Sequence, residues 1–454
     1  MSSFPPDPSP RAVTVVVPTW NGHERVRRCL ESLVDPALRE VIVVDNGSEA
    51  PIHLRDMAWP RCRVLRMPQN EGFAAGCNAG IHVATSPFVA ILNDDARAGP
   101  RTFTKLVEHC ERQARVGFVG PRSNYVKGRQ CWTDTAGLDV EDVEAIEARF
   151  EARFAKRCED VSYLAGLCLL ARRTTWLALD GFDDAFGLGN FEDDDLCLRS
   201  RLAGHRLLVA HDAYVWHEGS ATFGESGIDY GALMRKQREL FLQRWRESPL
   251  AHAEVASFYG QHEEVLERAH ELRALEGHAR AWAAAPLARA HESVGANDAA
   301  AAEWARVLRL APCHVEAWTA TALHALAGDE DCKADELFAF IEAELPMDRL
   351  ERARLDTERA RLHAMRRRPA DDARADALLD HALACVADYL PAREVSAALA
   401  LARGDLRAAH AALEALADSQ NPDVLHNLAV ARQLCGDLVG ALEAKERAQR
   451  AATR

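Results

Sequence analysis

The chain has 454 residues, which is enough for two or three domains with separate buried cores. Its 55 basic and 69 acidic residues give a net charge of −14, which argues against nucleic-acid binding, because phosphate contacts need a basic face. The 12 cysteines show no Cys-x-x-Cys pair and no zinc-ligand spacing, so we expect reduced thiols and a cytoplasmic protein.

The first eleven residues are rich in proline and serine and contain no apolar core. We therefore expect a disordered leader at 1–11 rather than a signal peptide. No apolar run is long enough for a membrane span, so we expect no integral membrane segment. Peripheral docking at the inner face of a membrane stays open.

Four short apolar runs alternate with helical patterns in the first hundred residues. The runs lie at 12–18, 40–44, 63–67 and 88–92. This alternation predicts right-handed crossovers and a mainly parallel sheet. Polar residues follow each run, and ligands bind such sheets at the C-terminal ends of the strands.

A dinucleotide-binding fold is the obvious structural rival. The first run is followed by Pro18-Thr19-Trp20-Asn21, and no Gly-x-Gly-x-x-Gly appears there, which argues against that fold. Gly72 and Gly76 follow the third run, where a phosphate loop and an ordinary glycine turn explain them equally well.

Asp94 and Asp95 close the fourth run. Two carboxylates at the end of a buried strand offer hard oxygen ligands to Mg²⁺ or Mn²⁺, which in turn hold a diphosphate. An aspartate turn at a strand end is the structural alternative.

Four consecutive acids, at 192–195, precede a helical pattern formed by Leu196, Leu198 and Leu202. Such a run either complements a helix dipole as a solvated first turn or serves chemistry that uses the charge. His217 follows in a loop-like segment and, taken alone, is more typical of a structural histidine.

Further strands are predicted at 116–119, 161–172, 206–210 and 213–216, and further helices at 24–33, 140–154 and 230–245.

Together these motifs resemble the catalytic domain of family 2 glycosyltransferases, the inverting enzymes that use nucleotide sugars. The resemblance covers about residues 13–223. The segments that carry it are Pro18-Thr19-x-Asn21, Val44-Asp45-Asn46-Gly47-Ser48, Asn70-x-Gly72-Phe73-x-x-Gly76-x-Asn78, Leu92-Asn93-Asp94-Asp95, Gly120-Pro121-x-Ser123-Asn124, Gly181-Phe182-Asp183, Glu192-Asp193-x-Asp195-Leu196-Cys197-Leu198-Arg199 and His217-x-Gly219-Ser220. The resemblance implies a GT-A fold, an α/β domain with a Rossmann-like, mainly parallel sheet, over residues 12–250.

The resemblance also implies roles for individual residues. Asp193 would be the catalytic base with Glu192 and Asp195 as acidic neighbours, and Asp95 and His217 would bind the divalent metal. Asn93 stands where the family's Asp-x-Asp-type motif has an acid, which predicts a poorer metal site. The nucleotide-sugar donor would be held by Pro18, Thr19, Asn21, Asp45, Asn46, Asn78 and Asp94.

The chemistry of sugar transfer requires such a set. A divalent metal neutralises the charge that develops on the departing nucleoside diphosphate. A carboxylate removes the proton of the acceptor hydroxyl, which attacks from the opposite face and inverts the anomeric carbon. We expect the acidic run to raise the pKa values of its own members.

From about residue 251 the chain is rich in Ala, Leu, Glu and Arg with helical spacing. A small–glycine–small spacing recurs in this part at Ala288, Gly295 and Ala300, at Ala397, Gly404 and Ala409, and at Ala429, Gly436 and Ala441. Pro312, Trp318 and Gly328 fit another unit. The pattern resembles tetratricopeptide repeats over residues 251–454, and an Ala-rich bundle without true repeats is the alternative. Stacked helix pairs form a groove that could hold a peptide, orient a glycan acceptor or serve homodimerisation.

The sequence therefore predicts an inverting, metal-dependent transfer of a sugar from a nucleotide donor. The expected acceptor is a protein or peptide, slightly favoured, or a surface glycan under assembly. A non-catalytic adapter, whose repeats bind a partner, is the alternative that Asn93 favours. A nucleotidyltransferase would share the strand-end aspartates but gives no reason for an acidic helix followed by a histidine loop.

Overall fold

The computed structural model describes residues 9–53, 61–132, 139, 141–187, 189–219, 229–366 and 368–452. The chain divides into two compact units. The first comprises residues 1–320 and 343–346, and the second comprises residues 321–342 and 347–454.

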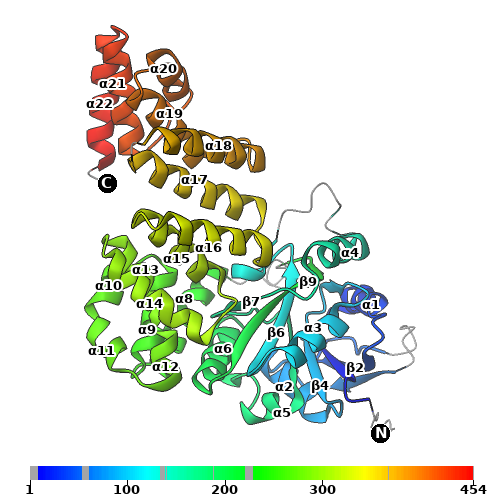
Figure 1. Ribbon diagram of the computed structural model, residues 1–454. Coiled ribbons are helices and arrows are strands. Elements are labelled where there is room, and N and C mark those ends of the chain that lie inside the picture. Colours follow the sequence, from blue (N-terminus) through cyan, green and yellow to red (C-terminus); the bar gives the residue numbers. More distant parts are fainter. Residues whose placement is uncertain are drawn as a thin grey trace. The chain divides into compact units, whose positions relative to one another are not determined.

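Within the described residues, the first unit contains a mixed sheet of nine strands (Figure 1). They are β1 (Val13–Thr19), β2 (Leu38–Asp45), β3 (Cys62–Arg66), β4 (Phe88–Leu92), β5 (Ala96–Ala98), β6 (Val116–Ser123), β7 (Cys158–Val161), β8 (Cys168–Arg172) and β9 (Arg206–His217). The order is β3-β2-β1-β4-β8-β6-β9-β5, and β7 pairs with β9. Strands β3, β2, β1 and β4 are parallel, and β8 is antiparallel to β4 and β6. The predicted α/β fold is confirmed.

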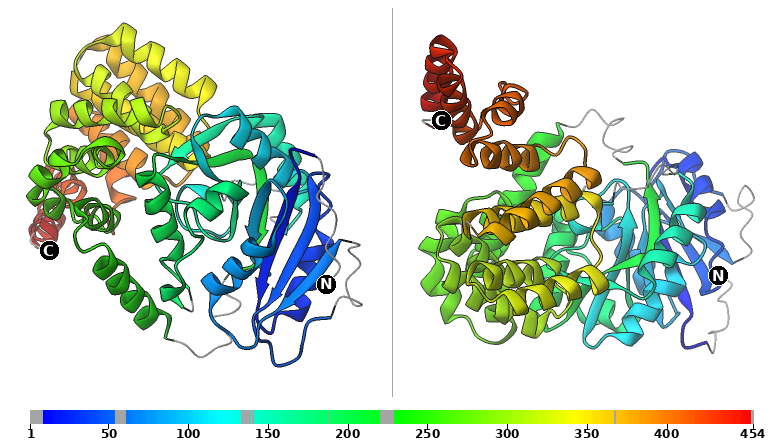
Figure 2. Two further views of the ribbon diagram at one scale, coloured as in Figure 1. Left: turned by 90° about the horizontal axis from the view of Figure 1, so that it is seen from below. Right: turned by 45° about the horizontal axis from the view of Figure 1, so that its top comes forward.

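Helices cover both faces of this sheet (Figure 2). Successive side chains of a strand point to opposite faces, so Val15 and Val17 of β1 enter one core and Val16 enters the other. Helices α1 and α3 cover the first core, and α2, α5 and α6 cover the second. The helices that flank the sheet are α1 (His23–Glu31), α2 (Phe73–Val83), α3 (Thr102–Arg112), α4 (Val143–Phe154), α5 (Arg173–Ala178) and α6 (Glu192–Leu202).

Two predicted strand boundaries differ in the structure. The apolar stretch 161–172 is divided into β7 and β8, and the turn between them carries residues that contact the acidic run. The two predicted strands at 206–210 and 213–216 are one strand, β9. The polar residues His211 and Asp212 interrupt its apolar pattern, yet both are buried because β6 and α3 supply partners for them.

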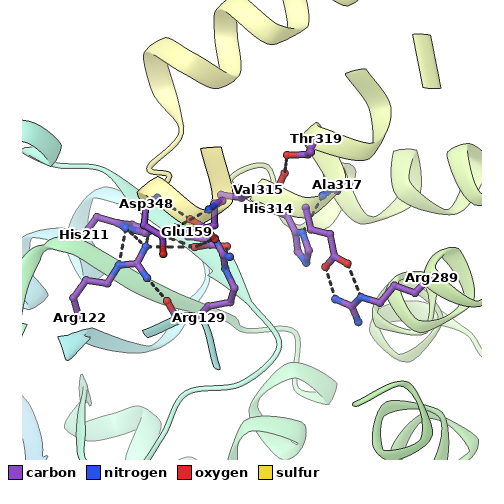
Figure 3. A network of polar contacts seen from close by, with 12 residues as sticks. Arg122, Arg129, Glu159, His211, Arg289, His314, Val315, Ala317, Thr319 and Asp348 are labelled. Carbon is purple, nitrogen blue, oxygen red and sulfur yellow. Dashed lines mark hydrogen bonds and ion pairs between the residues drawn. The ribbon is translucent and has the colours of Figure 1, made fainter. Parts of the chain in front are cut away.

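A buried polar network joins three strands of the first unit (Figure 3). Glu159 on β7 accepts hydrogen bonds from Arg129 at 2.7 and 3.1 Å and lies 3.4 Å from Nε2 of His211 on β9. Nε of Arg122 on β6 donates to Nδ1 of His211 at 2.9 Å. Burial and the Arg122 cation lower the pKa of His211 to about 3. The imidazole is therefore neutral and accepts at Nδ1.

The first unit continues through a layer of helices after the sheet. These helices are α8 (Tyr230–Arg244), α9 (Pro249–Phe258), α10 (His262–Glu267), α11 (Ala269–Ala274), α12 (Gly277–Trp282), α13 (Ala284–Ser293) and α14 (Asn297–Leu310). Phe191 and Leu198 share one apolar core with Leu250 and Trp304. Packing therefore continues across residue 250, and a domain boundary at that residue stays a prediction.

The chain passes between the units within α15 (Val315–Ala327), within α16 (Asp331–Glu344) and between residues 346 and 347. The other helices of the second unit are α17 (Arg349–Arg366), α18 (Pro369–Cys385), α19 (Leu390–Ala402), α20 (Leu406–Glu414), α21 (Pro422–Leu434) and α22 (Leu438–Ala452). Consecutive helices pack as pairs. Gly404 and Gly436 have φ values of 79° and 89° between paired helices, a conformation that favours glycine. The C-terminal part is helical, and the tetratricopeptide assignment stays a prediction.

No described helix combines the length and the apolar character required to cross a bilayer.

Candidate active site

The C-terminal ends of β2, β1 and β4 lie side by side, because these strands are adjacent and parallel. Thr19 at the end of β1 is in register with Asp45 at the end of β2, and Pro18 is paired with Val44. The backbone N–H of Asn46 donates to the carbonyl oxygen of Thr19 at 2.8 Å. The sequence-predicted donor residues of these strands thus share the edge at which parallel sheets bind ligands.

Asp94 joins the ends of β1 and β4. Its Oδ2 accepts a hydrogen bond from Oγ1 of Thr19 at 2.6 Å, and its Oδ1 lies 3.4 Å from Nε of Arg25. Burial raises the pKa of Asp94 to about 6, although Arg25 and Thr19 favour the charged form. A Cβ at Gly22 would lie 2.2 Å from Oδ2 of Asp94, so only glycine fits this corner without displacing the carboxylate.

Asp45 closes the loop that follows β2. The buried carboxylate accepts hydrogen bonds from the backbone N–H groups of Ser48 and Ile52, each at 3.0 Å, and pairs with Arg66. Burial favours the neutral acid, but these hydrogen bonds and the Arg66 cation lower the pKa of Asp45. Asp45 therefore shapes the loop as an ionised residue.

Three predicted donor-binding asparagines form hydrogen bonds between segments that are distant in the sequence: Asn21, Asn46 and Asn78. Their contacts are Asn21 Oδ1 to the N–H of Glu49 at 2.9 Å, Asn46 Nδ2 to the carbonyl oxygen of Gly72 at 2.8 Å, and Asn78 Nδ2 to the carbonyl oxygen of Phe182 at 2.8 Å. The first two lie at the strand-end edge, whereas Asn78 ties α2 to the segment before the acidic helix.

Asp95 and His217 meet through the antiparallel pair β5–β9, in which Ala96 is opposite His217. Nε2 of His217 lies 3.2 Å from Oδ1 of Asp95. Nδ1 lies 2.7 Å from the carbonyl oxygen of Tyr125, so this nitrogen carries a proton and Nε2 faces the carboxylate. Burial opposes charging of the ring, but Asp95 and the Tyr125 carbonyl raise the pKa of His217.

This pair suits a divalent cation. Oδ1 of Asp95 is buried with no partner besides the His217 ring, and Oδ1 of Asn93 is buried without a hydrogen bond; carboxylate oxygen and imidazole nitrogen both bind Mn²⁺. Among the residues that the structure describes, no group of three or more His, Cys, Asp or Glu side chains could hold a metal alone. Mg²⁺ commonly takes one or two protein carboxylates and completes its shell with substrate phosphates and water. The residues present therefore fit a cation that is shared with a diphosphate.

Asp193 lies in the first turn of α6, where two neighbours fix its carboxylate. Its Oδ2 accepts hydrogen bonds from the hydroxyl of Tyr163 at 2.7 Å and from the N–H of Gly166 at 3.1 Å. Burial and the charge of Asp193 raise the pKa of Tyr163, so the phenol stays protonated as a donor. The half-buried carboxylate is thereby held in one orientation.

The other acids of the run have distinct environments. Burial and the charge of Asp193 raise the pKa of Glu192 and raise that of Asp194 to about 7. The upward direction agrees with the prediction for these two residues, with burial as the larger cause and the neighbouring acid as the second. Asp195 is fully buried and accepts hydrogen bonds from Nε of Arg199 at 2.7 Å and from the indole of Trp245 at 2.9 Å, which is a structural role.

One strand pair connects the base candidate to the metal-ligand candidates. The backbone N–H of Asn93, at the end of β4, donates to the carbonyl oxygen of Leu167 at 2.9 Å. Gly166, the residue before Leu167, donates to Asp193. Asp95 and Asp193 therefore flank the same end of the β4–β8 pair, although they are distant in the sequence.

Several contact residues were not predicted from the sequence. Arg25 contacts Asp94, Tyr163 contacts Asp193, and Lys127 contacts Asp194. The partners of each pair are distant in the sequence, so no local sequence pattern indicates these contacts. Arg66 could have been found, because it ends β3 in register with Asp45 at the end of β2.

Residues 14–174 match the family model described as glycosyl transferase family 2, so the N-terminal part of the chain carries a domain of this family. The pre-mycofactocin glycosyltransferase of Mycobacterium tuberculosis is 34% identical over 222 residues, which cover 46% of this chain and 44% of the relative. The chain thus spans less than half the length of that relative.

The N-acetylglucosaminyl-diphospho-decaprenol L-rhamnosyltransferase of the same organism is 26% identical over 271 residues, which cover 52% of this chain and 87% of the relative. Among solved structures, S. aureus TarS 1-349 is similar with 15% identity and a TM-score of 0.37, over 84% of this chain and 93% of that chain. The parallel strand order and the family match agree with the predicted GT-A type of fold.

Proposed function

We propose that this protein is an inverting glycosyltransferase that moves a sugar from a nucleoside-diphosphate donor to an acceptor hydroxyl. The observation that carries the proposal is the position of three residues at one end of the β4–β8 pair. Asp95 and His217 face each other there, and Asp193 is anchored beside them through Gly166.

The donor would lie along the edge formed by the ends of β1, β2 and β4. Thr19 and Asn21 would contact the nucleoside, and Asp45 and Asn46 would keep their loops in the shape that receives it. The Thr19–Asp94 hydrogen bond supports this arrangement, because it joins the ends of β1 and β4.

Asp95 and His217 would hold Mg²⁺ or Mn²⁺, which when bound neutralises charge on the leaving diphosphate. The protein contributes two things to that site. The carbonyl of Tyr125 fixes the His217 ring through Nδ1, and burial keeps Oδ1 of Asp95 free of other hydrogen bonds.

Asp193 would act as the base. It would take the proton of the acceptor hydroxyl while the new bond forms between that oxygen and the anomeric carbon, and the bond from this carbon to the diphosphate oxygen breaks. Tyr163 and Gly166 orient the carboxylate for this role. One displacement by one base gives inversion of the anomeric carbon.

The acceptor would be a hydroxyl of a protein, a peptide or a glycan. The name of one relative, N-acetylglucosaminyl-diphospho-decaprenol L-rhamnosyltransferase, gives a glycolipid acceptor and so supports the glycan class. The helical pairs of the second unit would offer a groove for the larger part of the acceptor.

The direct experiment offers a panel of uridine, guanosine and thymidine diphosphate sugars with Mn²⁺ to the full-length protein. Mass spectrometry and proton NMR then identify the products and the anomeric configuration of the released or transferred sugar. We expect turnover of one donor with inversion. Retention of configuration, or no turnover with any donor, would contradict the proposal.

A further inference from the structure

Four aromatic side chains are exposed among the described residues of the first unit: Tyr125, Tyr230, Phe258 and Tyr259. Their exposed fractions run from 48% to 62%. Large aromatic side chains are usually buried, and a cluster left in contact with water commonly marks a binding surface. We call these four residues the aromatic rim.

One end of the aromatic rim lies beside the metal-ligand candidates. The ring centroid of Tyr125 is 6.1 Å from that of His217. Tyr230, on α8, donates its hydroxyl hydrogen to Oδ1 of Asn190 at 3.0 Å. Burial and the nearby groups Tyr125, Asp193 and Glu192 raise the pKa of Tyr230. Tyr230 therefore lies within electrostatic reach of both Tyr125 and the base candidate.

Lys127 connects the other end of the aromatic rim to the acidic run. Its Nζ lies 4.3 Å from the ring centroid of Phe258, 5.0 Å from that of Tyr163 and 3.9 Å from Oδ1 of Asp194. Tyr163 is the residue that donates to Asp193. Lys127 thus contacts both Phe258 and Tyr163, the residue that orients the carboxylate of Asp193.

Tyr259 extends the surface beyond Phe258. Its ring centroid is 5.1 Å from that of Phe258 in an edge-to-face contact, and the guanidinium of Arg238 lies 4.5 Å from the Tyr259 ring. The two exposed rings at the end of α9 therefore contact each other and the side chains of Lys127 and Arg238.

We propose that Tyr125, Tyr230 and Phe258, with Lys127, form the acceptor subsite and that they receive an uncharged saccharide. This inference rests on the proposed function and names its acceptor class. A sugar ring has an apolar C–H face that packs on an aromatic ring and hydroxyls that donate to carboxylates and amide oxygens. The aromatic rim and the adjoining Glu192, Asp193 and Asn190 offer both kinds of partner.

Other acceptor chemistries fit this surface less well. The carboxylate of Asp193 repels a phosphorylated or carboxylated acceptor, and the described cations beside the acidic run are already paired, Lys127 with Asp194 and both Arg199 and Arg244 with Asp195. A lipid tail needs a continuous apolar groove, whereas Lys127 and Arg238 lie on the rings of the aromatic rim. An aromatic peptide is the remaining competitor, and the experiment separates it from a saccharide.

The test is saturation-transfer NMR on the full-length protein with Mg²⁺ and uridine diphosphate. The saccharide probes are methyl glycosides of glucose, galactose, mannose, rhamnose and N-acetylglucosamine, together with cellobiose and maltose. The peptide probe is an unglycosylated peptide that contains Ser, Thr and Tyr. The variants are Phe258→Ala and Tyr230→Ala, which alter exposed side chains on two different helices.

The matched control is Leu177→Ala on α5. This side chain is also exposed, and α5 begins beside Pro87, at the opposite end of β4 from Asp95. We expect at least one saccharide to bind and both rim variants to weaken it about five- to tenfold, which is the effect of losing one aromatic contact, with no change in the control.

Two results would overturn the inference. The first is that no saccharide shows binding that is weakened by Phe258→Ala and Tyr230→Ala. The second is that only the peptide shows such binding. Calorimetry with uridine, guanosine and thymidine diphosphates on the same samples tests the donor site separately. If the wild-type protein binds none of the three nucleotides, the proposed function is contradicted. If it binds a nucleotide but no saccharide, only this inference is contradicted.

Discussion

Nε2 of His217 lies 3.2 Å from Oδ1 of Asp95, and Nδ1 of the same ring lies 2.7 Å from the carbonyl oxygen of Tyr125. The carbonyl can only accept a hydrogen bond, so it fixes the proton on Nδ1 and turns Nε2 toward the carboxylate. Such an arrangement is typical of a metal-binding histidine whose second nitrogen is held by the backbone.

Removing either side chain of this pair should weaken donor binding. We expect Asp95→Asn and His217→Gln each to lower the affinity for the nucleotide sugar in the presence of Mn²⁺ by about 10- to 100-fold, since the metal links protein and diphosphate. Calorimetry with and without Mn²⁺ measures the effect. His82→Gln, an exposed histidine on α2, is the matched control. Equal donor affinity with Mn²⁺ and with a chelator would contradict the metal role.

The hydroxyl of Tyr163 should matter for rate and not for donor binding. Tyr163→Phe removes the hydrogen bond to Oδ2 of Asp193, and a hydrogen bond to a charged group contributes about 1.5–3 kcal/mol. We therefore expect kcat to fall by about tenfold or more, with an unchanged dissociation constant for the donor. In an Asp193→Asn background the same substitution should have almost no further effect. An equal, additive loss in that background would argue for a role independent of Asp193.

The neutral His211 should make the fold sensitive to acid. Its pKa is lowered to about 3 by burial and by Arg122, whereas the unfolded chain takes up this proton near pH 6.5. Between these values the unfolded state binds more protons, so stability rises with pH and is lost as the pH falls from 6.5 toward 3. Urea unfolding of wild type at pH 4 to 7 measures the slope, and we expect His211→Asn to reduce it by about 1.4 kcal/mol per pH unit. Parallel slopes for the two proteins would contradict the assignment.

The extent of the first unit can be tested by shortening the chain. A chain that ends at Pro346 contains all of the first unit together with residues 321–342 of the second, so we expect it to unfold cooperatively and to bind nucleotide as the full-length protein does. A chain that ends at Leu250 keeps α8 but lacks the later helices that share an apolar core with Phe191 and Leu198, and we expect it to be unstable or to aggregate. Circular dichroism melting measures both. A cooperative transition at the full-length temperature for the shorter chain would support a boundary at residue 250.

The sequence predicted the parts of the fold that local pattern controls. The β-branched run 12–18 and the apolar run 88–92 correspond to β1 and β4, because a strand buried on both faces needs continuous apolar residues. Strand β9 was predicted as two pieces, because the hydrogen-bond partners of His211 and Asp212 come from β6 and α3 and are not visible in the local sequence.

The candidate site was predictable to the same degree. The strand-end position of Asp95 and the first-turn position of Asp193 are local properties and appear in the sequence. The contacts of Tyr163 and Lys127 depend on how the turn between β7 and β8 and the segment after β6 pack against α6, so no spacing in the sequence indicates them. Phe258 lies beyond the segment that matches the family model, which is why the aromatic rim is evident only in the structure.

The most direct test of the account is the transfer rate of Asp193→Asn, measured beside its affinity for the donor. The substitution keeps the shape of the side chain and removes its ability to take a proton. We expect the rate to fall by about 10²- to 10⁴-fold while donor affinity in the presence of Mn²⁺ changes less than about twofold. Transfer at the wild-type rate by this variant would contradict the account.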